Sequence, residues 1–116
     1  MAEESRIDAD DEWFVGEDRT IRFTVSGDTD GIENWNITFE LFTRRAKPGD
    51  APLMVVDAVG VAATPTTLPT ALVVVDGDET TAIGSGLYQY VLSRTDPGAR
   101  AVLAFGPAEL RTAVNA

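Results

Sequence analysis

Apolar and polar residues alternate with a period of two along much of the chain. Residues 19–25 read RTIRFTV, in which Ile21, Phe23 and Val25 alternate with polar positions. Residues 35–42 read WNITFELF and repeat the pattern. Because successive side chains of a strand point to opposite faces of a sheet, both segments are predicted to be half-buried β-strands. In the second strand we expect Trp35 at the centre of the core, because a tryptophan buries more area than any other side chain.

Most of the remaining apolar segments also favour strands. Their valines and aromatic residues have high β-propensity, and their connections are too short for helical crossovers. A single helical turn is expected at residues 79–83. Seven or eight short strands at the observed spacing predict an all-β, immunoglobulin-like antiparallel β-sandwich. The further strand segments are residues 12–15, 53–59, 71–75, both arms of a hairpin at 84–106, and an edge strand within 108–114.

The hairpin has one clearly apolar face. Tyr88, Tyr90 and Leu92 share that face and are expected to pack toward Trp35. The opposite face is only half polar, so we expect a neighbour or the N-terminal arm to cover part of it, and the strand edges are a candidate docking surface. The turn at residues 95–98 reads TDPG, whose proline and glycine suit type II.

Length and charge divide the chain into an arm and one domain. At 116 residues the chain has room for one core, which we place in residues 12–116. Residues 1–11 are polar, acidic and without periodicity, which predicts a flexible N-terminal arm. Residues 1–40 hold 12 acids and 3 bases, which gives −9 of the total net charge of −10. This charge disfavours nucleic-acid binding, and neither a membrane span nor a signal peptide is expected.

The residue types that most often carry catalysis are missing. The chain has no histidine and no cysteine, so none of its serines can have a histidine base and no thiolate is available. The acidic clusters lie in predicted loops, where carboxylates are normally solvated. We therefore expect no enzyme activity, no catalytic residue and no cofactor. A calcium site shared between two loops stays an open alternative, because Asp28 and Asp30 begin a calcium-loop pattern that is then not completed.

Two groups of residues are candidate partner contacts. Trp13 and Phe14 are adjacent, so in an extended segment they point to opposite faces and one of them is a candidate surface contact. Arg44, Arg45 and Lys47 form a basic cluster in a loop with proline and glycine. We expect this cluster to contact a partner; the alternative is a solvated loop without a binding role.

Several motifs occur in an order that resembles a known family. They are GEDRTIRFTV, DGIENWNITFELF, DETTAIGSGLYQY and RTDPGARAVLAFG. Together they resemble the small immunoglobulin-like β-sandwich proteins of tailed bacteriophage virions, including the N-terminal domain of baseplate upper proteins. The resemblance covers about residues 12–110. It matches structural positions, which are Gly16, Asp18, Trp35, Gly86, Tyr88 and Tyr90.

The resemblance implies a non-enzymatic structural protein of a bacteriophage virion. A free-standing domain of this kind is most similar to a capsid decoration, or cement, protein that stabilises contacts between major capsid subunits. A tail or baseplate component is the alternative, and a carbohydrate- or calcium-binding module for host recognition is a further one. The implied partners are the major capsid protein or other virion subunits, with many copies or a homo-oligomer in the assembly. The implied location is the virion, and the host cytoplasm during assembly.

Overall fold

The computed structural model describes residues 3–4, 13–47 and 49–112, and antiparallel β-strands are the main regular structure among them. The prediction of an all-β, antiparallel protein is confirmed. Most of the range expected to form a flexible arm lies outside the described residues. The strands are β1 (Glu3–Glu4), β2 (Arg19–Thr24), β3 (Ile37–Thr43), β4 (Met54–Val61), β5 (Thr70–Val75), β6 (Gly86–Arg94) and β7 (Ala101–Leu110).

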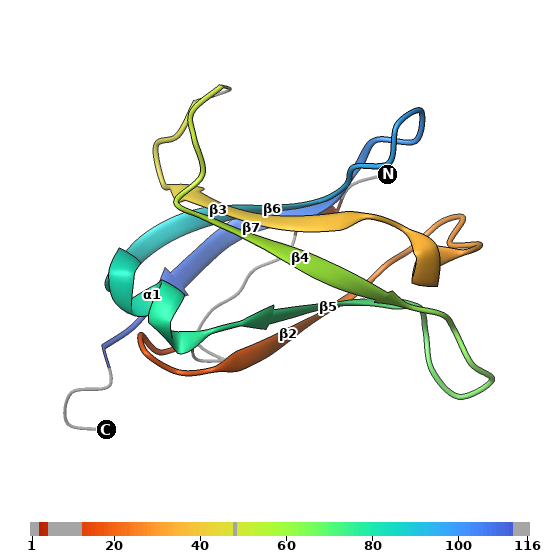
Figure 1. Ribbon diagram of the computed structural model, residues 1–116, viewed down its shortest axis with the longest axis horizontal. Helices are drawn as coiled ribbons and strands as arrows, with labels where there is room; N and C mark the ends of the chain where they lie inside the picture. Colours follow the sequence, from red (N-terminus) through yellow and green to blue (C-terminus); the bar gives the residue numbers. More distant parts are fainter. Residues whose placement is uncertain (1–2, 5–12, 48, 113–116) are drawn as a thin grey trace.

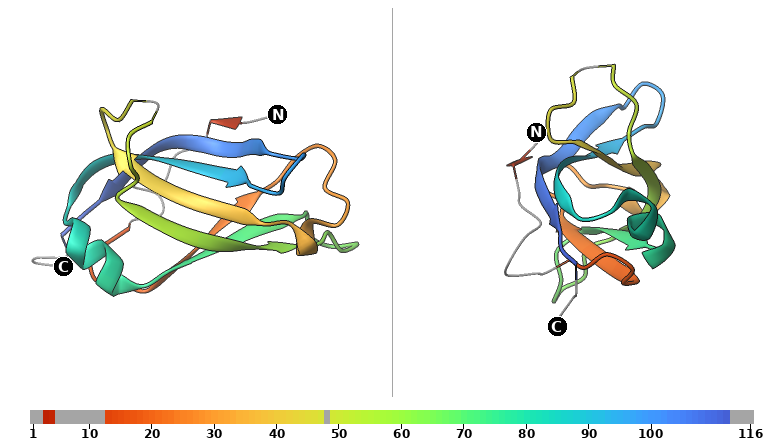
Figure 2. Two further views of the ribbon diagram at one scale, coloured as in Figure 1. Left: turned by 45° about the horizontal axis from the view of Figure 1, so that its top comes forward. Right: turned by 90° about the vertical axis from the view of Figure 1, so that its left-hand side faces the viewer.

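The strands form one curled sheet in the order β1-β7-β6-β3-β4-β5-β2 (Figure 1). β4 belongs to both halves of the curl, because Met54–Ala58 pairs with β3 and Val59–Val61 pairs with β5. The half made by β3, β6 and β7 therefore lies over the half made by β5 and β2 (Figures 1 and 2). Phe14, which precedes β2, forms a parallel bridge to Arg111, just after β7. This bridge brings the chain before β2 against the end of β7.

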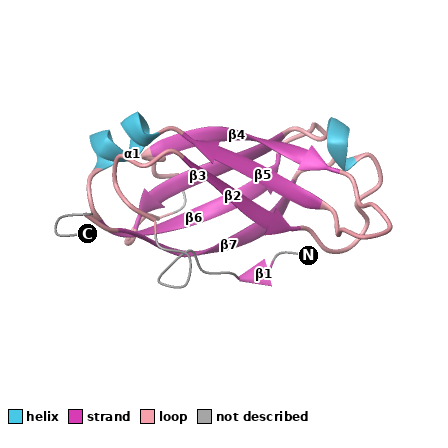
Figure 3. Ribbon diagram, turned by 90° about the horizontal axis from the view of Figure 1, so that it is seen from below, coloured by secondary structure: helices cyan, strands magenta, loops and turns pink. Residues whose placement is uncertain are grey.

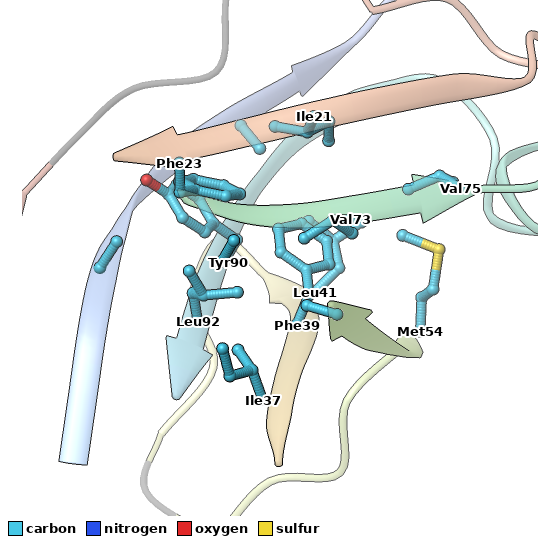
Figure 4. Close-up of a cluster of buried hydrophobic side chains, with 14 of the residues drawn as sticks. Ile21, Phe23, Ile37, Phe39, Leu41, Met54, Val73, Val75, Tyr90 and Leu92 are labelled. Carbon is cyan, nitrogen blue, oxygen red and sulfur yellow. The ribbon is translucent and has the colours of Figure 1, made fainter. Parts of the chain in front are cut away.

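The core fills the space between the two halves of the curl. Four aromatic rings contact one another there, with centroid distances from 5.3 Å between Phe23 and Tyr90 to 6.4 Å between Trp13 and Phe39. Figure 4 shows aliphatic side chains from β2 to β6 around the rings of Phe23, Phe39 and Tyr90. The buried positions of β2 and β3 are the apolar ones that alternate in the sequence. The period-2 prediction for these strands is confirmed.

The prediction that Trp35 occupies the centre of the core is wrong. Trp35 is half-buried and packs against the edge of the core, whereas Trp13 is fully buried. The strand pattern does not extend back to Trp35, because β3 begins only at Ile37. Tyr90 and Leu92 are buried as expected, and the ring of Tyr90 stacks on Phe39.

A short helix connects β5 to β6. The expected turn at residues 79–83 is part of α1 (Gly77–Ile83), which begins two residues earlier. The carboxylate of Asp76 caps the helix by accepting a hydrogen bond from the backbone N–H of Asp78 at 3.0 Å. The buried Thr80 hydroxyl accepts a hydrogen bond from the Gly16 N–H at 2.9 Å. These contacts hold α1 against the turn that precedes β2.

A second short helix lies at the opposite end of the sheet. The 3-10 helix η2 (Ile32–Asn34) packs against β4 through the fully buried Ile32. Gly60 of β4 lies directly against the backbone of Ile32, and a Cβ atom at Gly60 would clash with the Ile32 carbonyl. Glycine is therefore required at this position by a close approach of two backbones.

Candidate interaction surface

A row of side chains crosses the outer face of the sheet half formed by β4, β3, β6 and β7. The strand registers align Val55, Glu40, Val91 and Phe105 side by side in this row. Directly paired residues point to the same face, so all four lie on the outside. Val55 is 51% exposed and Phe105 is 41% exposed, while Glu40 and Val91 are half-buried. We call these four residues the outer row.

A second row runs parallel to the outer row and is fixed by hydrogen bonds. It aligns Phe42, Gln89 and Pro107 across β3, β6 and β7. The side-chain amide of Gln89 donates to the carbonyl oxygens of Thr43 at 3.1 Å and Ala46 at 3.3 Å. These bonds tie the face of the sheet to the start of the loop that follows β3. The face of the sheet therefore adjoins the first residues of that loop.

The loop after β3 carries the predicted basic cluster. Arg44, Arg45 and Lys47 are exposed, and none of them forms an ion pair with another described residue. Asp50 stabilises the turn, because its side chain accepts a hydrogen bond from the Lys47 N–H at 2.8 Å and its own N–H donates to the Lys47 carbonyl at 3.0 Å. The loop rises on the outer side of the sheet in both orientations of Figures 1 and 2. Three cations thus border a sheet face that carries the exposed apolar side chains of Val55 and Phe105.

The structure separates the other two candidate contacts. Trp13 is fully buried in the core, while Phe14 is half-buried and bridges to Arg111. The expectation that the pair divides between inside and outside fits this arrangement, and Phe14 is the member left near the surface. Phe14 lies beside the end of β7, whereas the basic loop follows β3, and β6 lies between these strands. The structure does not bring Phe14 and the basic loop together.

Part of the outer row could be predicted from the alternation along the hairpin. Leu87, Gln89, Val91 and Ser93 were expected to share a half-polar face of the hairpin, and all four lie opposite the buried side of β6. Val55 and Phe105 were missed because their relation to Val91 depends on strand pairing. Sequence periodicity assigns a residue to a face of its own strand, but it does not reveal which strands are neighbours.

Several acidic residues in the described part of the chain form hydrogen bonds that stabilise turns, helix ends and contacts between loops. Within the described part of the chain, no three His, Cys, Asp or Glu residues are grouped so that they can hold a metal ion. Asp28 accepts a hydrogen bond from the Asp30 N–H at 3.2 Å, which is a bond within one turn. Asp76 caps α1, and the Asp18 carboxylate accepts a hydrogen bond from the Gly77 N–H at 2.8 Å.

Asp96 ties together two loops at the end of the molecule that carries η2. Its carboxylate accepts hydrogen bonds from the Arg94 side chain at 2.7 Å and from the Asn36 side chain at 2.8 Å and backbone N–H at 3.1 Å. The hydrogen bond from Arg94, and then the one from the Asn36 backbone, lower the pKa of Asp96 below its ordinary value. Asp96 is therefore a structural carboxylate that is stabilised in its charged form.

The same end of the molecule places a cation over Trp35. The Arg94 guanidinium lies 4.1 Å from the centre of the Trp35 ring, and the indole N–H donates to the Asp30 carbonyl at 3.2 Å. Arg94 thus covers one face of the indole that a sugar platform would use. Trp35 therefore links the loop that contains Asp30 to Arg94 at the end of β6.

Comparison of the chain with models of protein families, with curated proteins and with solved structures found no significant match. Among the helices in the described ranges, none has the length and apolar character required to cross a membrane.

Proposed function

We propose that this chain is a non-enzymatic structural protein that binds partner subunits through the outer row and the adjoining basic loop. The observation that carries the proposal is the combination of exposed Val55 and Phe105 with a fixed loop whose three cations have no ion-pair partner among the described residues. Apolar residues bordered by charges are typical of protein-binding surfaces. Other valines are exposed on β5 and late β4, but in the described ranges no loop with three basic residues adjoins them.

The fold that we propose is an immunoglobulin-like β-sandwich. The strand order supports it, because β7-β6-β3 and β5-β2 occupy opposite halves and β4 changes partner between them. β3, β4 and β5 are consecutive antiparallel neighbours, and β2 returns beside β5, which is a Greek-key arrangement. The parallel bridge between Phe14 and Arg111 is a further supporting feature.

For the biological setting we propose a bacteriophage virion, with the protein serving as a capsid decoration protein. This setting is supported by the resemblance of the four sequence motifs to virion β-sandwich proteins. A partner-binding face on a domain without an assigned catalytic residue is compatible with it. The partner would be the major capsid protein or another virion subunit, and many copies would add avidity.

The copy number in purified particles tests this setting. Quantitative mass spectrometry of particles from the phage that encodes the chain is expected to find hundreds of copies. A few to tens of copies would indicate a tail or baseplate component instead. Complete absence from the particles would overturn the structural role.

Paired variants test the proposed surface. The triple variant Arg44→Glu, Arg45→Glu, Lys47→Glu is expected to reduce incorporation into particles at least tenfold, and Val55→Asp to reduce it as well. The matched controls are Arg22→Glu and Val74→Asp, which change exposed residues on β2 and β5 in the other half of the sheet. Equal incorporation of the surface variants and their controls would overturn the assignment of this face.

A further inference from the structure

The edge of β7 accepts a strand from the N-terminal part of the chain. Glu3 and Glu4 pair in parallel with Ala104 and Phe105, and β1 is placed beside β7 in Figure 3. On its other side β7 pairs with β6 along nearly its whole length. Unpaired backbone groups at a strand edge are a template for another strand. The structure therefore shows which segment this edge can bind and in which register.

The segment from Glu4 to Phe14 has more residues than the stretch between their pairing partners, Phe105 and Arg111. Glu4 pairs with Phe105, and Phe14 pairs with Arg111. There are 14 − 4 = 10 residue steps along the N-terminal segment and 111 − 105 = 6 steps along β7. Ten steps of extended chain reach at most about 33–36 Å. The N-terminal segment thus has four more residue steps than the stretch of β7 beside it, and this extra length lets β1 leave its own β7 edge while it stays tethered to the domain.

We propose that the β7 edge at Ala104–Phe105 is an acceptor site for the β1 segment of a second copy of this chain. Copies are then linked by exchange of β1, in the same parallel register that β1 adopts within one chain. The acceptor edge is continuous with the proposed partner-binding face, because Phe105 belongs to the outer row. The inference rests on the proposed structural function and names a second copy as one of the bound partners.

The β1 segment of the same chain competes with the β1 segment of a second copy for one β7 edge. A strand of two residues forms few hydrogen bonds, so its pairing is weak and reversible. A short tether gives β1 an effective concentration in the millimolar range for its own β7. A free chain at micromolar concentration therefore keeps its own β1, whereas exchange becomes competitive at millimolar concentration or in a dense array of copies.

Disulfide trapping tests the exchange, and the natural chain offers a background without cysteine. The full-length variants Glu4→Cys and Phe105→Cys place one thiol each on two paired residues. Neighbouring strands bring such residues within the Cα separation of about 4.4–6.8 Å that a disulfide needs. Equimolar mixing and oxidation at about millimolar concentration is expected to give a heterodimer joined by Cys at positions 4 and 105. At micromolar concentration its yield is expected to fall at least tenfold.

The control pairs Glu4→Cys with Val74→Cys, an exposed position on β5 in the other half of the sheet. It is expected to give only random cross-linking. The double variant Glu4→Cys, Phe105→Cys is expected to form an intramolecular disulfide at micromolar concentration and covalent oligomers at millimolar concentration. Thermal melting of each reduced variant establishes that it is folded.

Three results would overturn the exchange. They are a mixed-variant yield equal to that of the Val74→Cys control, a double variant that stays intramolecular at every concentration, and a double variant with no disulfide at all. The proposed partner-binding face is tested separately by the basic-loop variant in particles. A failure of trapping together with reduced incorporation of that variant would remove the exchange and leave the proposed function standing.

Discussion

Trp13 and Trp35 are stabilised by different kinds of contact. Trp13 packs edge-on against Phe39 with an interplanar angle of 62°, and its buried indole nitrogen has no hydrogen-bond partner among the described residues. Trp35 is half-buried and has both a cation and a carbonyl oxygen as partners. The stability contributed by Trp13 therefore comes from packing, whereas part of that contributed by Trp35 comes from polar contacts.

Trp13→Ala is expected to lower the free energy of unfolding by about 3–5 kcal/mol, because it opens a large cavity in the core. Trp13→Phe is expected to cost clearly less, since it keeps an aromatic ring and gives up no hydrogen bond. Urea denaturation measures both values. Trp35→Ala serves as the control and is expected to cost less than Trp13→Ala. Equal losses for the two alanine variants would contradict the placement of Trp13 at the core.

The local sequence could not distinguish these two tryptophans. Trp35 continues the alternation of Ile37, Phe39 and Leu41 by one step, so the pattern assigns it to the buried face. The burial of Trp13 instead depends on the bridge between Phe14 and Arg111, which joins residues 97 positions apart. Contacts over such a separation leave no periodic signal in a single segment.

Individual strands were predictable because their alternation is local. The buried positions of β2, β3 and β6 are largely those that the sequence pattern assigns to the inside. The turn after β6 was also predictable from its proline and glycine. In the structure, Gly98 has a φ of 81° and the Ala99 N–H donates to the Asp96 carbonyl. The early start of α1 was missed because Gly77 reads as a helix breaker. In the structure, Gly77 allows α1 to approach the backbone of Gly16 closely.

The Asp96 contacts make the hairpin of β6 and β7 sensitive to acid. The pKa of Asp96 is lowered in the folded chain from its ordinary value of 3.8, so its charged form stabilises the fold above that pH. This contribution is lost as the pH falls below 3.8 and through the folded pKa. Asp96→Asn is expected to destabilise the chain at pH 7 and to flatten the fall in stability as the pH drops below 3.8.

Urea denaturation across this pH range measures the effect of Asp96→Asn. Asp57→Asn is the matched control, because Asp57 lies exposed on β4 and accepts no hydrogen bond from a described side chain. This control removes one exposed carboxylate without removing a hydrogen bond from a described side chain. An Asp96→Asn profile that runs parallel to the unmodified one would contradict the role of the carboxylate.

The charge distribution determines how the whole molecule responds to salt. Nineteen acids and nine bases give the net charge of −10, so the folded chain repels itself at low ionic strength. Added NaCl screens this repulsion and is expected to raise the melting temperature. The triple variant of Arg44, Arg45 and Lys47 to Glu changes the net charge to −10 − 6 = −16 and is expected to show a larger rise. A melting temperature that falls with salt would show that attractive ion pairs dominate.

The order of the strands in the sheet could not be predicted from the sequence. Periodicity indicates that β2 and β5 are half-buried. It does not indicate that they pair with each other along six residues each, because β3 and β4 lie between them in the sequence. The outer row is equally non-local, because it draws one residue from each of four strands. The basic loop beside the outer row could be predicted from the sequence, because Arg44, Arg45 and Lys47 are close together in the chain. The class of surface was thus partly predictable, whereas its geometry was not.

The double pairing of β4 has a consequence for how this protein can change in length during evolution. One residue inserted between Ala58 and Val59 would leave the pairing with β3 unchanged, but would turn the following side chains to the opposite face. Val59 would then occupy the place of Gly60, where the Ile32 carbonyl leaves no room for a Cβ atom. Insertions in the loops at residues 44–52 and 62–69 would avoid this conflict. Related chains are therefore expected to vary in length in those loops and to keep β4 at a constant length.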